Sequence, residues 1–412
     1  MPTTGFPSRE FTRFWVSETV SSFGTYVTLL ALQTLVVLTM GGSAQDVGWL
    51  NSARWFPYLL LGLVVGALVD RRSRRPVMVC TDLAQALLLI SIPVAWATGS
   101  LSMPVLLVIV FGYGTASLIN GAASMAFLPR LVAREDLQPA HARIDGADAV
   151  AQTTGPVLAG LLVKLVGAPV AVLVNAVTHL FSAVMLWSLR VREPDPIVSE
   201  LPNLRREITA GVRWVYGASG LKVLAISTHV WFAANAILGA VLAAYALVDL
   251  RLSAFQFGLI TACAGVGGVL GAVLSGIGGR RFGTGGAVIA AHTVSTLGAC
   301  LAVVAGIGTS GWAAALVLGA GQACHGFGIG FSNSHEMSYR QALTPDRLQA
   351  RTNTTMRSFN RAVIVVVAPL GGLLAVQLGA RQALLTAALV FLAATLILAA
   401  SPFRHARINV EI

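Results

Sequence analysis

The chain has 412 residues, of which 56% are hydrophobic and only 11% are charged, and its formal net charge is +11. Soluble domains carry about 25% charged residues, so this composition excludes an ordinary soluble protein and leaves no room for a sizeable soluble domain. A positive charge can indicate a nucleic-acid partner, but most of the 28 basic residues lie in alternate loops. That distribution favours a membrane protein.

The loops differ sharply in their basic residues. From the N-terminus, every second loop is rich in arginine, whereas the loops between them keep only Lys164, Arg251 and Arg381. The positive-inside rule then predicts that both termini lie in the cytoplasm. We therefore expect a multi-pass protein of the cytoplasmic membrane, surrounded by membrane lipids and without a nucleic-acid partner.

Apolar stretches of about 20 residues, the length of one helical span, recur along the chain. The predicted spans are 14–39, 48–69, 76–98, 103–126, 147–166, 168–189, 221–247, 255–277, 286–307, 312–332, 357–378 and 381–401. The predicted fold class is an all-α membrane protein with twelve transmembrane helices in two six-helix pseudo-repeats. The predicted parts are an N-terminal bundle over 1–190, a cytoplasmic linker over 191–220 and a C-terminal bundle over 221–412.

The linker contains one amphipathic stretch. Leu204, Ile208, Val212 and Val215 share a helical face that excludes the neighbouring arginines. The pattern suits a helix on the inner membrane surface, and a flexible linker is the alternative.

The two halves repeat. Ser43, Ala44 and Gly48 recur 210 residues later as Ser253, Ala254 and Gly258, and Gly66 with Arg71 recurs at the same lag as Gly276 with Arg281. Six spans per half give both copies the same orientation, which is how many transporters place a central site between two halves.

The loop after the second span, from Gly66 to Arg75, contains Asp70, Arg71, Arg74 and Arg75. It resembles the signature loop of the major facilitator superfamily, although Ser73 stands where that family usually has glycine. An anion at a helix C-terminus is disfavoured by the macrodipole, so Asp70 needs a partner. The resemblance implies a latch with Arg357 or Arg361 at the start of span 11, which closes the inner side in the outward-facing state. A topology anchor is the alternative, but it leaves Asp70 unexplained.

Two further segments resemble parts of the same superfamily. Gly155, Pro156 and Gly160 in span 5 resemble the Gly-Pro motif of its antiporters, with an ordinary bent span as the alternative. The segment 127–140 resembles an inner loop of a bacterial branch that includes enterobactin-type exporters and macrolide efflux pumps, and Arg54, Pro57 and Asp82 also fit that branch. The resemblance implies export.

Ionisable residues within spans are expensive in lipid and are functional candidates by default. Histidines 179, 229, 292 and 325 belong to this group. The candidates for proton coupling are Glu18, Arg54, Asp82, Asp145, Asp148 and His325. Alternatives remain open: Glu18 can reach the inner surface beside Arg13, Arg54 can bond carbonyls, and a lone histidine often has a structural role.

The candidate cavity lies among spans 1, 4, 7 and 10. Its polar and aromatic residues are Gln33, Asn120, His229, Trp231, Asn235 and Gln322. A largely apolar cavity with few polar points suits an amphipathic organic molecule. The absence of an arginine from span 4 weakens the usual route of drug–proton coupling, for which Arg54 is a substitute.

Together these features predict a monomeric secondary exporter of an amphipathic small molecule, working by alternating access and coupled to protons. No cofactor or metal is expected, because the four cysteines are isolated and no metal-spaced motif is present. Enzymatic activity finds no support in the sequence. The alternatives are a lipid or lysophospholipid flippase of the same fold and a non-transporting sensor.

Overall fold

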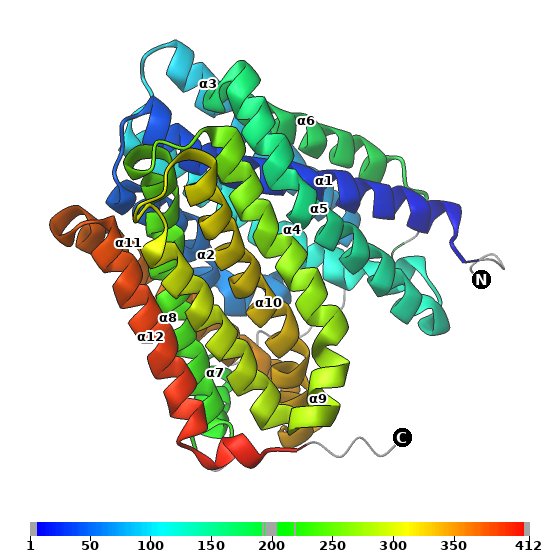
Figure 1. Cartoon of the computed structure of the whole chain (residues 1–412). Coiled ribbons are helices and arrows are strands. Elements are labelled where there is room, and N and C mark those ends of the chain that lie inside the picture. Colours follow the sequence, from blue (N-terminus) through cyan, green and yellow to red (C-terminus); the bar gives the residue numbers. More distant parts are fainter. Residues whose placement is uncertain (1–5, 192, 194–203, 218–219, 408–412) are drawn as a thin grey trace. The chain divides into compact units, whose positions relative to one another are not determined.

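The structure is a computed structural model that describes residues 6–191, 193, 204–217 and 220–407 (Figure 1). Within this part of the chain all regular structure is helical. The helices are α1 (Arg9–Thr34), α2 (Ala44–Asp70), α3 (Arg74–Ala97), α4 (Met103–Leu131), α5 (Leu137–Val166), α6 (Ala168–Trp187), α7 (Leu204–Tyr216), α8 (Lys222–Ala244), α9 (Ala254–Val304), α10 (Gly311–Leu343), α11 (Asp346–Leu378) and α12 (Ala380–Ala399), with the short elements η1 (Leu35–Thr39), η2 (Arg134–Asp136), η3 (Tyr245–Asp249) and η4 (Pro402–His405).

Ten helices of the described residues are long and apolar enough to cross a membrane. One of them, α9, has 51 residues and includes the predicted span 255–277 and most of the predicted span 286–307, with a break in helical geometry at Gly283, whose φ is 70°. A positive φ is readily adopted by glycine, so the two spans join without a loop. The helix α2 covers the predicted span 48–69. The all-α fold with two sets of spans is confirmed.

Several helices extend beyond the predicted spans. The helix α5 begins at Leu137 and α11 at Asp346, whereas the corresponding spans were predicted from residues 147 and 357. Hydropathy marks only the apolar part of a helix, while intrahelical hydrogen bonds continue into polar surroundings. The inner segment 127–140 is therefore largely helical, with η2 between α4 and α5.

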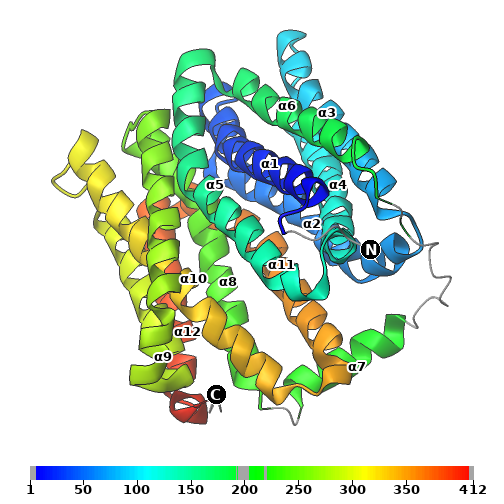
Figure 2. The ribbon, with the colours of Figure 1, turned by 90° about the vertical axis from the view of Figure 1, so that its right-hand side faces the viewer.

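The chain divides into two compact units. Unit 1 consists of Met1–Leu35 and Ala53–Leu204, and unit 2 of Val36–Ser52 and Arg205–Ile412. In unit 1, α1 packs against α5 and α6, and α3 against α4 and α6, as Figure 2 shows for α1, α5 and α6. In unit 2, α8 packs against α11 and α12, and α9 against α10 and α12. The same four pairings therefore recur in each unit.

The repeat extends to loop geometry. The π-helical turns η1 and η3 begin 210 residues apart, at Leu35 and Tyr245. The next turns have positive φ at equivalent positions, 66° at Gly41 and 52° at Arg251. The following helices both start with a serine cap, since the backbone amides of Asp46 and Gln256 each lie within hydrogen-bonding distance of the serine hydroxyl three residues earlier. Such local agreement supports a duplicated six-helix unit.

Unit 2 also includes the turn between α1 and α2. The hydroxyl of Ser52 donates to the Val365 carbonyl of α11 at 2.7 Å. A Cβ added to Gly372 would meet the backbone of Ala44 and Gln45, so this glycine allows a close approach of α11 to the start of α2. Gly372 of α11 thus has a packing role within unit 2.

Helix α7 lies within the segment predicted as the linker. Much of the remaining linker, residues 192, 194–203 and 218–219, lies outside the described residues. Val215 is fully buried against Ala225 and Met356, while Ile208 is 37% exposed. The apolar face of α7 is thus partly covered by α8 and α11.

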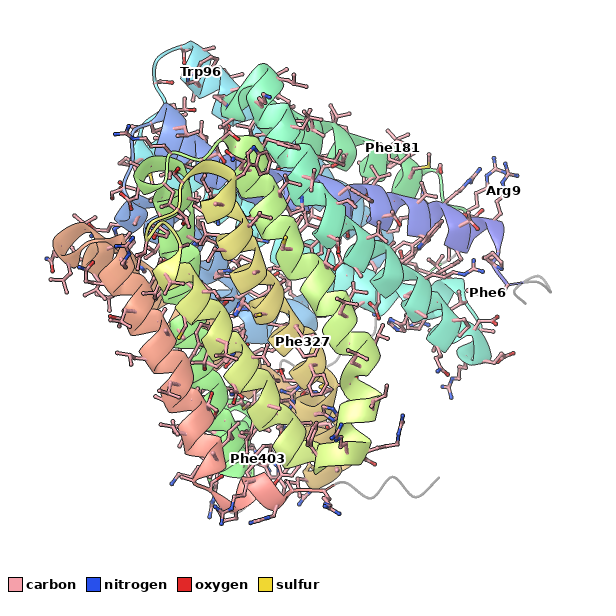
Figure 3. All side chains as sticks on the ribbon, viewed as in Figure 1. Phe6, Arg9, Trp96, Phe181, Phe327 and Phe403 are labelled. Carbon is pink, nitrogen blue, oxygen red and sulfur yellow. The ribbon has the colours of Figure 1, made fainter. Side chains whose placement is uncertain are left out.

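Aromatic contacts occur in both units. In Figure 3, Phe6 is labelled near the start of α1, and its ring centroid lies 5.0 Å from that of Phe11. Phe403 of η4, also labelled, packs edge-on against Tyr339 of α10 at 5.0 Å. These contacts pack the residues before α1 against its first turns, and η4 against the C-terminal part of α10.

Candidate functional site

Unit 1 encloses a polar cavity of ≈ 210 Å³, which we call the N-cavity. Each of the helices α1 to α6 contributes to its wall, mostly with side chains spaced three or four positions apart, so that they share one helical face. The lining residues are Glu18, Ser21, Ser22, Thr25, Tyr26, Leu29, Arg54, Asp82, Gln85, Ser117, Asn120, Gly121, Asp148, His179 and Ser182.

Asp82 is the centre of hydrogen bonding in the N-cavity. Its Oδ2 accepts from the Ser182 hydroxyl at 2.6 Å, and its Oδ1 accepts from Asn120 Nδ2 at 3.1 Å. His179 Nδ1 lies 3.1 Å from the same Oδ1. The carboxylate is 2% exposed. Donors from α4 and α6 thus hold Asp82 of α3 in one orientation.

His179 connects this network to a buried nitrogen. An ionised carboxylate only accepts hydrogen bonds, so Nδ1 carries the proton when it bonds Asp82. His179 Nε2 is buried and has no hydrogen-bond partner among the described residues. The ring therefore keeps one nitrogen available to take up a further proton.

Glu18 and Asp148 are less completely bonded than Asp82. Glu18 is hydrogen-bonded to the Ser124 hydroxyl and interacts electrostatically with Asp82 and Asp148. Asp148 Oδ2 accepts from the Tyr26 hydroxyl at 3.1 Å. Three carboxylates therefore share one cavity.

Arg54 is the one permanent cation among the residues that line the N-cavity. Its guanidinium lies over the Trp55 ring at 4.9 Å and near the phenol groups of Tyr26, Tyr58 and Tyr113. Within the described residues it forms no ion pair closer than 4.0 Å. Its charge is therefore held by aromatic groups and is available to an anionic group in the cavity.

Glycines bring the lining helices together. A Cβ added to Gly155 would lie 2.7 Å from the Cβ of Tyr26, so α5 can approach α1 only with glycine at this position. This approach supports the hydrogen bond between Tyr26 and Asp148. Pro156 and Gly160 of the same motif are also buried.

Most of the coupling candidates meet in this cavity, but two do not. The N-cavity brings together Glu18, Arg54, Asp82 and Asp148, whereas Asp145 is exposed one turn earlier on α5. His325 belongs to unit 2, where Nε2 lies 3.0 Å from Asn235 Oδ1 and the ring stacks on Trp231 with centroids 5.4 Å apart.

The residues predicted to line one cavity also lie in different places of the structure. Asn120 lines the N-cavity, and Gln33 of α1 does not. In unit 2, Gln322 is 8% exposed. His229 instead joins α7 to the bundle, since Nε2 bonds the Tyr216 hydroxyl at 2.6 Å and Nδ1 bonds Asn360 at 2.7 Å. The structure gives His229 a packing role.

The signature loop is described only in part. The surroundings of Gly66 and the side chain of Asp70 are not described, so the predicted latch with Arg357 or Arg361 stays a prediction. The backbone amides of Arg74 and Arg75 donate to the Glu193 carboxylate at 2.7 and 2.9 Å. Arg75 Nε donates to the Leu186 carbonyl at 3.0 Å. Within unit 1, the start of α3 is thus fixed to the end of α6.

Sequence reasoning left out Tyr26, Gln85 and Ser182 as site residues and named His179 only among the span histidines. A signal for them exists, because Glu18, Ser21, Ser22, Thr25 and Tyr26 follow a 3.6-residue period along α1. A polar stripe on an apolar helix indicates a surface that faces a cavity rather than lipid.

Two repeated units of membrane-spanning helices, one of which encloses a charged cavity, are the features of a membrane transporter. The model of the Major Facilitator Superfamily matches residues 14–360. The chain belongs to this superfamily.

Relatives include both uncharacterized and efflux proteins. The chain is 26% identical over 247 residues to an uncharacterized MFS-type transporter y4rN of Sinorhizobium fredii, covering 59% of this chain and 60% of the relative. It is 23% identical to macrolide efflux protein A of Streptococcus pyogenes, covering 52% and 53%, and 26% identical to the multidrug efflux pump Tap of Mycolicibacterium fortuitum, covering 68% and 70%. The first relatives are therefore matched over about half of their length.

Solved structures share the fold. A bacterial homologue of the iron transporter ferroportin in an inward-facing state gives a TM-score of 0.73 at 18% identity, with 94% of this chain and 98% of that chain covered. The nucleoside transporter NupG gives 0.77 at 11% identity, with 95% and 99% covered. At such identities the likeness concerns the fold alone.

Proposed function

We propose that this protein is a secondary exporter that moves an amphipathic organic molecule across the cytoplasmic membrane in exchange for protons. The observation that carries the proposal is the charge content of the N-cavity, where Glu18, Asp82 and Asp148 face one arginine, Arg54. Efflux proteins among the relatives support the direction of transport.

The N-cavity contains more negative charge than its own residues compensate. With all three carboxylates ionised and His179 neutral, the N-cavity would hold two more negative than positive charges. Removing an ion from water costs several kcal/mol even after relaxation. The cavity therefore favours the uptake of a proton or of a cationic group of the substrate. Because both relieve the same excess charge, they compete, and competition is sufficient for exchange.

Glu18 is the proposed exchange group. Asp82 is held by donors from two other helices, whereas Glu18 has the single hydroxyl of Ser124 and two neighbouring acids. A carboxyl with few fixed donors can change its charge with little rearrangement of the bundle. Tyr26 and Asp148 stand next to it as the second acidic position.

The remaining parts of the proposal concern orientation and gating. Both termini lie in the cytoplasm, as the distribution of basic residues predicts. The two units alternate access to the cavity, with Asp70 and Arg357 or Arg361 as the latch on the inner side. Asp70→Asn should impair transport while insertion into the membrane stays normal; unimpaired transport in this variant would remove the latch.

The proposed function is tested in inside-out vesicles that contain the protein. Ethidium, an amphipathic cation, and erythromycin, a macrolide, are offered with and without an imposed pH gradient. We expect uptake into the vesicles that rises with an acidic interior and disappears when a protonophore collapses the gradient. Gradient-independent uptake would contradict proton coupling, while exchange of fluorescent lipid between leaflets would identify a flippase instead.

A further inference from the structure

Unit 2 contains a second, smaller cavity of ≈ 100 Å³, which we call the C-cavity. It is lined by Thr228, Trp231, Phe232, His292, Ile329, Ser332, Asn333 and Glu336 from α8, α9 and α10. No part of the mechanism proposed above uses it. Its relation to the N-cavity shows what it can do.

The two cavities occupy equivalent places in the repeat. At the lag of 210 residues that relates η1 to η3, Glu18, Ser21 and Ser22 correspond to Thr228, Trp231 and Phe232. At the same lag Asp82 corresponds to His292. Four residues that line the N-cavity therefore have counterparts that line the C-cavity.

Each cavity contains one pair of a histidine and a carboxylate. In the N-cavity the acid is Asp82, with His179 Nδ1 at 3.1 Å. In the C-cavity the histidine occupies the equivalent position, and His292 Nε2 lies 3.5 Å from Glu336 Oε1. His292 thus stands at the position of Asp82, and its acidic partner comes from α10, so that each cavity has a histidine–carboxylate pair built from different helices.

A hydroxyl group also lies beside a carboxylate in both cavities. Glu18 of α1 interacts with the Ser124 hydroxyl of α4. In unit 2 the hydroxyl is on α8, the counterpart of α1, and the acid is on α10, the counterpart of α4: Thr228 Oγ1 lies 3.4 Å from Glu336 Oε2, while it donates to the Leu224 carbonyl at 2.8 Å.

His292 has an unused nitrogen. The side chain is 2% exposed, and Nδ1 has no hydrogen-bond partner among the described residues. His179 shows the same feature at Nε2. A buried polar atom without a partner is costly and calls for an explanation, and a nitrogen that binds a proton or water provides one.

We propose that His292 and Glu336 form a second proton-binding site of the transporter, in which the His292 ring takes up the proton and the Glu336 carboxylate compensates its charge. This inference rests on the proposed function only for its use in transport. Proton binding itself can be measured without transport.

The charged and titratable groups around this pair favour histidine as the proton acceptor. Arg340, one turn along α10, interacts electrostatically with Glu336 and also with Arg357 of α11. His325 of α10 is bonded to Asn235 of α8, and the α8 histidine, His229, is bonded to Tyr216 and Asn360. From α12 the neighbours are Phe391, which packs on Trp231, and Thr395, near Thr296, and neither ionises. With Arg340 beside Glu336, the site is nearly neutral before a proton binds.

The test is a pH titration of ¹⁵N-histidine signals in the purified full-length protein in lipid nanodiscs. The His292→Asn variant identifies the His292 signal by its loss. We expect this signal to change with pH as the ring takes up its proton. In Glu336→Gln the transition should move to lower pH by about one unit, because the protonated ring loses its counter-charge. Glu336→Asp should restore most of the shift.

The control is Glu135→Gln, which removes an exposed acid of η2 and should leave the transition unchanged. Unaltered His325 signals show that a variant is folded. A His292 signal that does not respond to pH, or a transition that Glu336→Gln and Glu336→Asp leave in place, would overturn the second site. Neither result depends on export, so the proposed function stands or fails separately.

Discussion

The N-cavity and the C-cavity occupy equivalent places in the two units but differ in charge. The N-cavity contains three carboxylates and one arginine, with Asp82 bonded by Ser182 and Asn120. The C-cavity is lined by a single carboxylate, Glu336, with Arg340 close by and aromatic rings from Trp231 and Phe232. Both units thus contain a histidine–carboxylate pair that includes the equivalent positions 82 and 292, with different partners and different surroundings.

We propose separate roles for the two units on the basis of this difference. In the proposed mechanism, a proton and a cationic substrate compete in the N-cavity because of its excess of buried acid. The nearly neutral C-cavity would bind a proton but offer little attraction to a cation. The following predictions test this division, beginning with the largest expected effect.

Asp148→Asn should lower gradient-driven ethidium export by about tenfold or more, because one of the three acids of the N-cavity is lost. Asp145→Asn is a matched control one turn earlier on the same helix, where the side chain is exposed. Initial export rates in vesicles check both. Equal losses of export rate in the two variants would contradict a specific role of the N-cavity in export.

Asp82→Leu should destabilise the protein by about 3 kcal/mol, since it leaves the buried donors of Asn120 and Ser182 without their acceptor. His292→Leu should cost clearly less, because His292 has only one described partner, at 3.5 Å. Thermal unfolding in detergent compares the two. A larger loss of stability for His292→Leu than for Asp82→Leu would contradict the stronger hydrogen bonding assigned to the N-cavity.

Gly155→Ala should cost about 2 kcal/mol, because the added methyl group would meet Tyr26 and push α5 away from α1. Gly146→Ala, on the same helix, meets nothing within 4 Å and should stabilise the helix by about 1 kcal/mol. Unfolding curves give both values. A Gly155→Ala variant as stable as the wild type would contradict the close packing of these helices.

Ser182→Ala should cost about 1.5 kcal/mol, since the hydroxyl donates to a buried carboxylate at 2.6 Å. Ser295→Ala is the comparison variant in unit 2, where the buried hydroxyl has no hydrogen-bond partner among the described residues. That change should be neutral or slightly stabilising. Melting temperatures in the same detergent compare the two variants. Equal decreases would contradict the difference in hydrogen bonding between the two cavities.

Much of the fold was predictable because lipid imposes a simple rule on sequence. Spans need apolar runs of about 20 residues, and the α8, α10 and α12 runs begin within a residue or so of their predicted starts. The polar extensions of α5 and α11 were not predictable from hydropathy, because their stability comes from backbone hydrogen bonds and tertiary packing.

Individual residues of the site were predictable from the sequence, but their grouping in one cavity was not. Glu18, Arg54, Asp82 and Asp148 could be singled out because charge in a span is expensive. Their meeting in one cavity depends on the packing of four different helices, α1, α2, α3 and α5, which no local pattern encodes. His179 and Glu336 show this limit, since a histidine becomes informative only when its carboxylate partner from another helix is known.

The most direct test of proton-coupled export through the N-cavity is transport by the Glu18→Gln variant in proteoliposomes. Ethidium efflux down its own gradient is compared with ethidium movement driven by an imposed pH gradient. The account predicts that Glu18→Gln keeps the first and loses the second, whereas the wild-type protein shows both. Retention of full pH-driven transport by Glu18→Gln would contradict the assignment of Glu18 as the exchange group.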